Sequence, residues 1–247
     1  MKERIFAAAS VVLVSTAIIG FSAGSTGASF VGSTTNPNQS WNTQNVTSPA
    51  AFTSATSKPA GQIDLVWTAT ASPAGSHTLT YLVLRGPVGG PYAQVGTSAG
   101  LTYSDTPPAD GTYEYVVQAK MAQGAGFFTS ANSAKKSTKS DRTAPTAATG
   151  LLTAKGAAAG QVLVSWTAGT DAGTGVAGYT IHRSGVVAAC PATTPANYPN
   201  TTAVGVVTST TIGGLVSGSK YCFYLTTNDV AGNVSANSAA AGPQVAK

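Results

Sequence analysis

The sequence predicts an all-β protein in which two tandem β-sandwiches follow an N-terminal hydrophobic segment. Three features predict this fold: an internal repeat, apolar residues that alternate with polar ones, and turn signals at short intervals. The repeat is clearest in residues 60–69, AGQIDLVWTA, and residues 159–168, AGQVLVSWTA. Alternation is the period of a half-buried strand, so Trp67 and Trp166 are expected to face the cores. A chain of 247 residues with this repeat divides into two domains of about 100 residues each.

The composition is typical of a secreted all-β module. Charged residues make up 9% of the chain, and Gly and Pro are scattered between short apolar runs. The net charge of +5 is spread out, apart from one basic group. We interpret that group as a solvated linker, with attraction to an anionic polymer as the alternative, and we expect no nucleic-acid partner. Its members are Lys135, Lys136, Lys139 and Arg142.

The N-terminal segment, residues 1–28, is predicted to direct export. Lys2 and Arg4 precede an apolar run over residues 5–21, and small residues follow it. This pattern is typical of a cleaved signal peptide, and the alternative is a retained N-terminal anchor, which would be the chain's contact with a membrane. The STGASF junction at residues 25–30, followed by an Asn-rich stretch, resembles the export junction of camelysin/TasA-type surface proteins.

Residues 29–50 are predicted to form an extended polar segment with two aromatic residues, Phe30 and Trp41. The segment is too short for a core of its own, so these rings are expected to dock on the first sandwich or on a partner.

The first sandwich is predicted over residues 51–139 and the second over residues 140–247. Each consists of short apolar strands at intervals of about ten residues, separated by Gly, Pro, Asn and Asp. In the first repeat we expect the strand of Trp67 and strands over residues 79–85, 92–95, 101–104, 113–119 and 127–133. In the second we expect the strand of Trp166 and strands over residues 178–183, 204–207, 210–212, 221–226 and 233–238.

The second repeat resembles a fibronectin type III domain of bacterial surface proteins and secreted hydrolases. The motifs that carry the resemblance are DRTAP at 141–145, GYTIHR at 178–183, L-x-x-G-x-x-Y-x-F at 215–223 and D-x-A-G-N at 229–233. The first repeat resembles the family less closely, through Trp67, Tyr81, Arg85 and the YEY of 113–115. The resemblance implies immunoglobulin-like sandwiches, with Tyr221 buried and its hydroxyl bonded to the backbone upstream.

A disulfide is predicted between Cys190 and Cys222, the two cysteines of the chain. Two cysteines in an exported protein most often form one bridge, whereas a reducing compartment would leave two free thiols. If Tyr221 and Phe223 face the core, strand parity directs Cys222 and Tyr224 outward. The bridge would then pin the insertion that carries Cys190 across the outer face of the sheet.

A calcium site is predicted at Asp141, Asp171 and Asp229. In a fibronectin type III sandwich, the chain start, the loop between the second and third strands, and the last hairpin loop meet at one end. These loops carry the three aspartates, with Asn233 nearby, and Ca²⁺ prefers several oxygen ligands. The alternative is that each aspartate closes its own loop through a bond to the backbone. No other cofactor is expected.

Catalysis is not expected. Residues 96–100, GTSAG, match the G-x-S-x-G nucleophile pattern but lie between short strands with no helix signal, so we expect a glycine-rich hairpin. The two histidines, His77 and His182, are expected at the surface and are too few for an ordinary zinc site. Carboxylates are few and dispersed, which does not favour an acid/base pair.

The predicted function is a non-catalytic secreted or cell-surface interaction or spacer protein. An interaction face is predicted from side chains that point outward on the first sandwich, Leu82, Leu84 and Val116, together with Phe30 and Trp41. A protein or self-association partner is therefore expected, and one alternative is a subunit of an extracellular filament or matrix. A second alternative is an accessory carbohydrate-binding module. Its candidate aromatic residues are Tyr92, Tyr103, Tyr198 and Tyr224.

Overall fold

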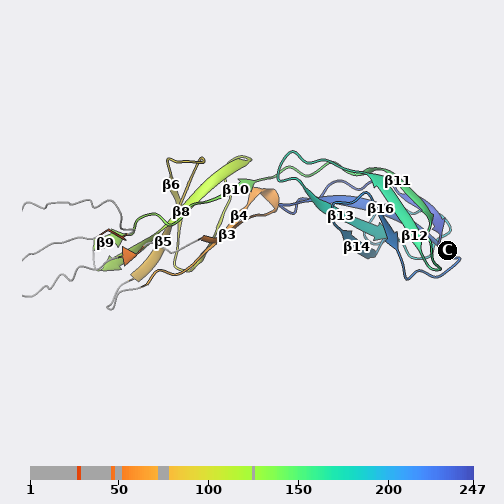
Figure 1. Ribbon diagram of the computed structural model, residues 1–247, viewed down its shortest axis with the longest axis horizontal. Coiled ribbons are helices and arrows are strands. Elements are labelled where there is room, and N and C mark those ends of the chain that lie inside the picture. The colour runs from red at the N-terminus through yellow and green to blue at the C-terminus, as the bar shows by residue number, and fades with distance from the viewer. Residues whose placement is uncertain (1–26, 29–45, 48–51, 72–77, 124–125) are drawn as a thin grey trace, which may run out of the picture.

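The computed structural model consists of two β-sandwiches arranged end to end (Figure 1). It describes residues 27–28, 46–47, 52–71, 78–123 and 126–247. A two-stranded pair, β1 (Gly27–Ala28) and β2 (Val46–Thr47), precedes the first sandwich. The all-β fold predicted from the sequence is confirmed, whereas the predicted segment bounds 1–28, 29–50, 51–139 and 140–247 stay predictions.

The first sandwich packs a three-stranded sheet against a five-stranded sheet, and all strand pairs are antiparallel. The smaller sheet has the order β3 (Phe52–Ser57), β4 (Ile63–Trp67) and β7 (Thr102–Asp105), with the 3₁₀ turn η1 (Pro59–Gly61) between β3 and β4. The larger sheet has the order β10 (Lys136–Ser140), β8 (Gly111–Gln123), β5 (Thr78–Gly86) and β6 (Ala93–Ser98), and β9 (Gly126–Thr129) also pairs with β8.

The second sandwich packs a three-stranded sheet against a four-stranded sheet, again antiparallel throughout. The smaller sheet has the order β11 (Thr149–Lys155), β12 (Val162–Thr167) and β15 (Ser209–Ile212). The larger sheet has the order β14 (Asn200–Val204), β13 (Val176–Arg183), β16 (Lys220–Asp229) and β17 (Ala241–Val245).

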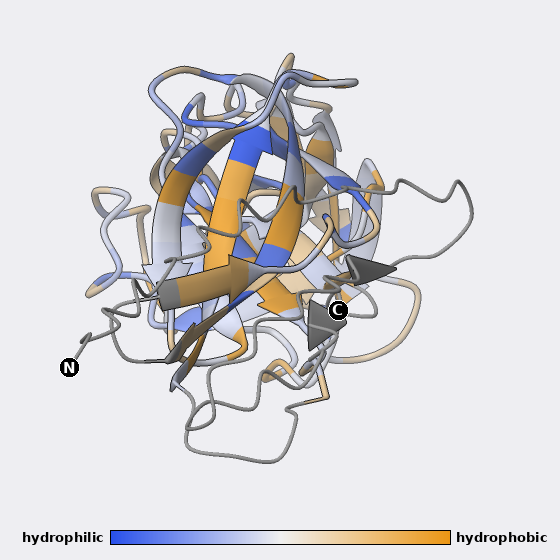
Figure 2. Ribbon diagram, turned by 90° about the vertical axis from the view of Figure 1, so that its left-hand side faces the viewer, coloured by the Kyte–Doolittle hydropathy of each residue, from blue (hydrophilic) through white to orange (hydrophobic). Residues whose placement is uncertain are grey.

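A buried tryptophan lies in the core of each sandwich, as the alternation predicts. Trp67 packs edge-on against Tyr81 with 5.6 Å between ring centroids, and Trp166 packs in the same way against Tyr179 at 5.2 Å. Such edge-to-face pairs contribute roughly 0.5–1.5 kcal/mol beyond the area they bury. Figure 2 shows the apolar and polar blocks that alternate along the strands.

A second, smaller core lies on the outer face of the larger sheet of the second sandwich. Cys222 is bonded to Cys190 with a Cα–Cα distance of 5.5 Å, so the predicted disulfide is present. Tyr198, from the insertion, packs edge-on against Tyr224 at 4.8 Å and donates its hydroxyl hydrogen to the carbonyl of Pro191. The predicted parity holds, but the insertion covers the outward side chains.

The prediction of a last strand over residues 233–238 is wrong. Apart from one isolated bridge at Val234, these residues lie outside the strands. Two serines of this segment form hydrogen bonds to the backbone of β16, each through its own backbone N–H and its own hydroxyl. Ser235 Oγ accepts a hydrogen bond from Thr227 N (2.8 Å), and Ser238 Oγ accepts one from Leu225 N (2.9 Å). Each serine N–H also donates to the carbonyl of the same partner residue. The serine hydroxyl thus takes the place of a backbone carbonyl in the ladder.

The first sandwich repeats this arrangement beside β8. Ser130 Oγ accepts from Ala119 N and Ser133 Oγ from Val117 N, at 2.9 and 3.0 Å. The expected strand over 127–133 accordingly ends early, because β9 stops at Thr129. The S-A-N-S sequence shared by residues 130–133 and 235–238 therefore encodes a serine-bonded edge in both sandwiches.

Candidate functional site

The junction between the two sandwiches is built around residues 139–143, which are bonded on both sides. The buried hydroxyl of Ser140 donates to the carbonyl of Gly61 (2.8 Å), and Gly61 N donates to the carbonyl of Asp141 (3.1 Å). Ser57 Oγ donates to the carbonyl of Lys139. The chain that leaves β10 is therefore fixed to β3 and η1 of the first sandwich.

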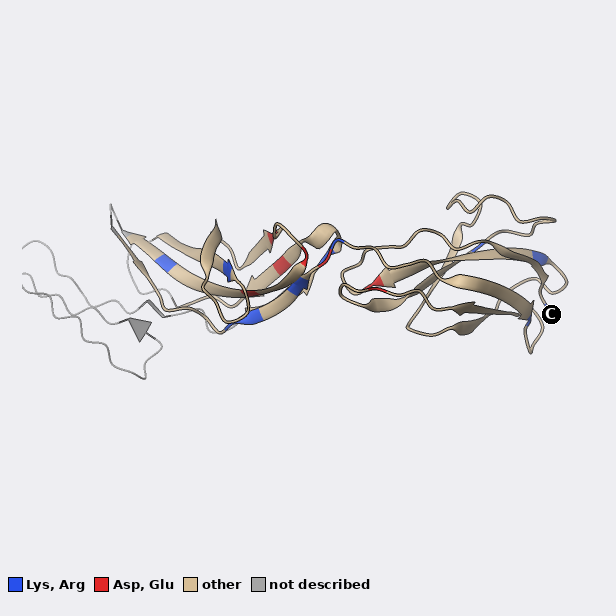
Figure 3. Cartoon of the chain, turned by 90° about the horizontal axis from the view of Figure 1, so that it is seen from above, with Lys and Arg blue, Asp and Glu red and all other residues tan. Residues whose placement is uncertain are grey.

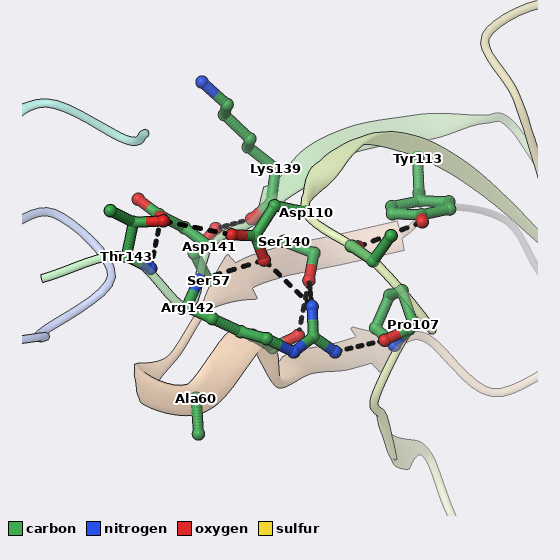
Figure 4. A network of polar contacts seen from close by, with 12 residues as sticks. Ser57, Ala60, Pro107, Asp110, Tyr113, Lys139, Ser140, Asp141, Arg142 and Thr143 are labelled. Atoms are coloured by element: carbon green, nitrogen blue, oxygen red, sulfur yellow. Dashed lines mark hydrogen bonds and ion pairs between the residues drawn. The ribbon is translucent and has the colours of Figure 1, made fainter. Parts of the chain in front are cut away.

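Arg142 anchors the same segment to the loop between β7 and β8 (Figure 4). Its Nη1 lies 2.9 Å from Asp110 Oδ1, its Nη2 donates to the carbonyl of Pro107, and its backbone N donates to Asp110 Oδ1 at 3.1 Å. The hydrogen bond from the Arg142 guanidinium holds the pKa of Asp110 below its ordinary value. Figure 3 shows this concentration of charge between the sandwiches.

Gly61 leaves room for that guanidinium. A Cβ on Gly61 would lie 2.6 Å from Arg142 Cζ, and the φ of +74° is one that L side chains rarely adopt. Only glycine therefore fits both the backbone and the packing at this position.

The second sandwich reaches the junction through Asn233, in the turn after β16. Asn233 Oδ1 accepts a hydrogen bond from Ala60 N (3.2 Å), and its Nδ2 donates to the carbonyl of Asp141 (3.1 Å). Asp229 holds the asparagine in place, because its two oxygens accept from Asn233 N and Nδ2 at 2.7 Å each. The Asn233 side chain thus forms hydrogen bonds both to η1 of the first sandwich and to the linker.

Lys139 supplies a further link across the junction. Its Nζ donates to the carbonyls of Ala172 (3.1 Å) and Gly173, in the loop between β12 and β13. The prediction of a solvated basic linker is therefore wrong for Lys139 and Arg142. The Lys139 ammonium bonds the β12–β13 loop of the second sandwich, and the Arg142 guanidinium bonds the β7–β8 loop of the first.

The three aspartates predicted to bind calcium lie together at this junction. One oxygen from each of Asp141, Asp171 and Asp229 lies within 4.8 Å of the other two. Asp141 and Asp229 are 1% and 3% exposed, and Asp171 is half-buried.

Each of these aspartates also bonds nearby backbone, as the alternative prediction states. Asp141 Oδ1 accepts from Thr143 N (3.1 Å), Asp171 Oδ2 from Gly175 N (2.6 Å), and Asp141 Oδ2 from Thr174 N and its hydroxyl. In contrast, Asp171 Oδ1 is buried and has no hydrogen-bond partner.

The predicted interaction face is only partly accessible. Val116 is 2% exposed, so its inclusion is wrong, and Leu82 and Leu84 are half-buried. Leu84 lies opposite Val116 in the β5–β8 register, so the alternation along the strands places both on the same face of the sheet. The alternation does not show that β2 lies beside β8. Phe30 and Trp41 lie outside the described residues.

Two of the four aromatic residues proposed for sugar contact are buried. Tyr198 and Tyr224 are each 1% exposed, which makes that prediction wrong for both. Tyr92 and Tyr103 are half-buried, and their hydroxyls donate to Glu114 and to the carbonyl of Val95.

The G-x-S-x-G stretch forms a turn, but not the expected hairpin, because β6 pairs with β5 in one sheet and β7 with β4 in the other. Ser98 Oγ accepts from Gly100 N (3.1 Å) and donates to the carbonyl of Thr102 (2.9 Å), so its hydroxyl closes the link between β6 and β7.

His182 is less exposed than expected, because its ring stacks on Tyr224 with 4.3 Å between centroids. Burial lowers its pKa below the ordinary value. His77 lies outside the described residues, as do the basic and apolar parts of the predicted signal segment. Among the residues that the structure does describe, no helix is long and apolar enough to span a bilayer.

Comparison with known proteins relates the chain to parts of proteins named exoglucanase and chitinase. No family model matches it. It is 34% identical over 152 residues to Exoglucanase B of Cellulomonas fimi, an alignment of 60% of this chain and 12% of the enzyme. It is 42% identical over 104 residues to Exoglucanase A of the same organism, covering 40% of this chain and 10% of the enzyme. Chitinase A1 of Niallia circulans is 33% identical over 154 residues, covering 61% and 19%.

Among solved structures, the chicken CNTN1 FN1-FN3 domains superpose with a TM-score of 0.54 at 19% identity, covering 78% of this chain and 65% of that one. Both sandwiches have the fibronectin type III fold. The resemblance predicted from the motifs is thereby confirmed at the level of the fold, and the chain matches only a small portion of the length of each enzyme. The likeness indicates a non-catalytic module, and the fold alone does not fix what it serves.

Proposed function

We propose that this tandem acts outside the cell as a stiff spacer that holds attached or neighbouring parts at a fixed separation and orientation. The observation that supports this most directly is the bonding of the linker. Ser140, Asp141 and Arg142 each bond the first sandwich, and Asn233 of the second sandwich bonds both η1 and Asp141. A tandem whose domains moved independently would have a solvated linker with few such bonds.

The disulfide and the relatives support an extracellular place for this spacer. Structural disulfides persist in oxidising compartments, and Cys190–Cys222 closes over a buried tyrosine pair. In relatives named exoglucanase and chitinase, the matched region is 10% to 19% of the length, which suits an accessory module that spaces other parts. A protein partner at either end remains part of this proposal, as does the filament alternative that involves Phe30 and Trp41.

Residual dipolar couplings test the stiffness of the junction. In a calcium-free buffer, the couplings of both domains of the natural protein should fit one alignment tensor. The double variant Lys139→Ala/Asn233→Ala removes the two side chains that bond one sandwich to the other, so its domains should require two tensors of different magnitude.

Asn237→Ala is the matched control. Asn237 is an exposed asparagine near the same turn, and its Nδ2 bonds the carbonyl of Thr193 rather than the junction. This variant should keep a single tensor. Two independent tensors in the natural protein would refute the spacer proposal.

A further inference from the structure

The larger sheet of the second sandwich ends in an open edge at β14. This strand is the outermost of its sheet and pairs with β13 on its inner side (Figure 1). Along an edge strand, alternate residues direct their backbone N–H and C=O groups away from the sheet. Among the described residues, none forms a hydrogen bond to the outer side of β14, and four of its five side chains are exposed. β14 therefore presents unpaired backbone groups to solvent.

Native sheets ordinarily protect such an edge with a charged side chain, a proline, a β-bulge or a cover. The five residues of β14, NTTAV, include no charge and no proline, and their register against β13 has no shift. No charged side chain occurs anywhere in residues 184–219. Arg183, which lies opposite Asn200, directs its guanidinium over the Tyr221 ring of β16, on the far side of β13. The edge thus lacks the usual devices that prevent pairing.

The strands at the other ends of the four sheets differ from β14 in this respect. β17 contains Pro243 and a register shift, and β11 has a register shift and lies against β17. β3 has a register shift and lies against β10, which carries two lysines. β7 and β15 are only four residues long. Short length, bulges, lysines and covers are the ordinary ways to protect an edge.

The equivalent edge strand of the first sandwich, β6, shows how a cover is built. The register of β6 against β5 is shifted, and Tyr103 of β7 donates its hydroxyl hydrogen to the carbonyl of Val95 on β6 at 3.0 Å. The corresponding residue of the second sandwich is Thr210, in the same register position on β15. Thr210 has no ring to extend over the edge. The second sandwich therefore lacks the contact that closes this edge in the first.

We infer that β14 pairs in antiparallel orientation with β14 of a second copy of this chain. The pairing is centred on Thr202, which lies opposite its own copy. Each Asn200 then lies opposite a Val204, and all five residues of both strands are paired. A two-fold contact between identical surfaces is the closed arrangement typical of homodimers. The larger sheets of the two second sandwiches become one continuous sheet.

The chemistry of this edge favours its own copy over a charged partner. An acidic or basic segment would find no opposite charge there. Two identical uncharged strands bring no like charges together, although the chain as a whole has a net charge of +5. Threonine and valine are good strand formers, and opposed threonines form favourable cross-strand pairs. Val206 and Val207, which follow β14 directly, are 68% and 43% exposed and extend the edge with apolar surface.

This inference goes beyond the spacer function, because the pairing uses no residue of the junction. The strands of the second sandwich run roughly along the long axis of the molecule (Figure 1). Since the paired strands are antiparallel, the two tandems would point in opposite directions. If each tandem is a stiff spacer, the dimer is a longer one with a first sandwich at each end. That consequence rests on the proposed function, whereas the pairing itself does not.

Sedimentation equilibrium of the full chain tests the pairing in a concentration series up to ~1 mM, which covers weak contacts. We expect a reversible equilibrium between monomer and dimer. Thr202→Lys places two lysines directly opposite each other and should weaken association at least about fivefold, because like charges across a strand pair repel. Thr202→Glu should weaken it in the same way. An equimolar mixture of the two variants should recover the dimer, since lysine then lies opposite glutamate.

Thr97→Lys is the matched control, because Thr97 is exposed on β6, the equivalent edge of the first sandwich. This variant should associate as the natural protein does. At low concentration all these variants should melt at the temperature of the natural protein, since the changed side chains are exposed. Hydrogen exchange provides a second measurement. The backbone amides of β14 should exchange more slowly as the concentration of the natural protein rises, but not in Thr202→Lys.

A natural chain that stays monomeric throughout the series would overturn the inference. Undiminished association of Thr202→Lys would overturn the assignment to β14. A mixture of the lysine and glutamate variants that associates no better than either alone would overturn the pairing centred on Thr202. None of these results bears on the dipolar-coupling test, because that test compares the two domains within one chain.

Discussion

The replacement Ser238→Ala tests whether a serine hydroxyl does the work of a backbone carbonyl at the edge of β16. In the natural protein, Ser238 Oγ accepts a hydrogen bond from Leu225 N at 2.9 Å, and Leu225 is fully buried. Alanine keeps the bond from Ser238 N to the Leu225 carbonyl but leaves the Leu225 N–H without an acceptor.

The expected cost of this replacement is about 1–3 kcal/mol, the penalty for a buried donor that loses its partner. The Ser238 hydroxyl also donates to the carbonyl of Ala239 at 3.0 Å, and the loss of that bond acts in the same direction. For a domain of about 100 residues, the change corresponds to a fall in Tm of roughly 4–20 °C.

Urea unfolding of the full chain measures the loss of stability, and hydrogen exchange of the backbone amides shows where in the chain the loss occurs. The unfolding transition of the second sandwich should shift, and the Leu225 amide should exchange faster, while the first sandwich is unchanged. Ser133→Ala, which removes the matching acceptor from Val117 N, should shift the first sandwich instead. Ser209→Ala is the control, because Ser209 is exposed on β15. A change below about 0.5 kcal/mol for Ser238→Ala, the scale of a neutral surface substitution, would refute the reasoning.

Two further predictions concern the outer face of the second sandwich. The double variant Cys190→Ala/Cys222→Ala should lose roughly 3–4 kcal/mol of unfolding free energy in denaturant melts, because the bridge closes a sequence separation of 32 residues. An unchanged midpoint, or a Tyr198 that stays fully protected in the variant, would contradict this. His182 should titrate below 6.5 in NMR spectra, because burial lowers its pKa. Since its pKa is depressed on folding, its contribution to stability is fully present above the pKa of the unfolded state and is lost as pH falls through the lower pKa of the folded state. His182→Gln should flatten that part of the stability profile, and a titration at or above 6.5 would refute the assignment.

The strand pattern of this chain can be predicted from its sequence, because the alternation of inward and outward side chains along a strand is a local property. Alternation at Ile63, Leu65 and Trp67 fixes one buried face, and the same holds for Val162, Val164 and Trp166. The two copies then imply two cores without knowledge of how the strands are ordered in the sheets. Parity also directs Cys222 and Tyr224 away from the main core, as the structure shows.

Parity does not reveal what covers an outward face. Tyr224 points away from the main core and is nevertheless buried, because the disulfide-linked insertion brings Tyr198 over it. Val116 is also outward and buried, and it lies on β8, which β2 contacts. Of the four tyrosines predicted for sugar contact, Tyr198 and Tyr224 are buried against each other under this insertion.

The serine-bonded edges lay beyond sequence reasoning for a different reason. Ser and Thr are abundant throughout the chain, so a single serine carries no signal, and the apolar pattern predicts strands over 127–133 and 233–238 instead. The signal was the repetition itself: two small polar residues spaced by three, at the same place in each domain, after the long strand. Ser130 and Ser133 in one domain and Ser235 and Ser238 in the other make equivalent bonds.

The junction was only half predictable, and the difference has a physical cause. The aspartates were expected to meet because loop ends of one sandwich converge, which depends only on the order of strands within that domain. The bonds of Arg142 to Pro107 and Asp110, and of Asn233 to Ala60, join residues that are 32 to 173 positions apart. No period in the sequence encodes contacts over such separations, and the bond between Ala60 and Asn233 depends in addition on the angle between the two domains. The two kinds of information meet at Asn233: Asp229, whose place at this end of the second domain follows from the order of its strands, holds the asparagine that contacts the first domain.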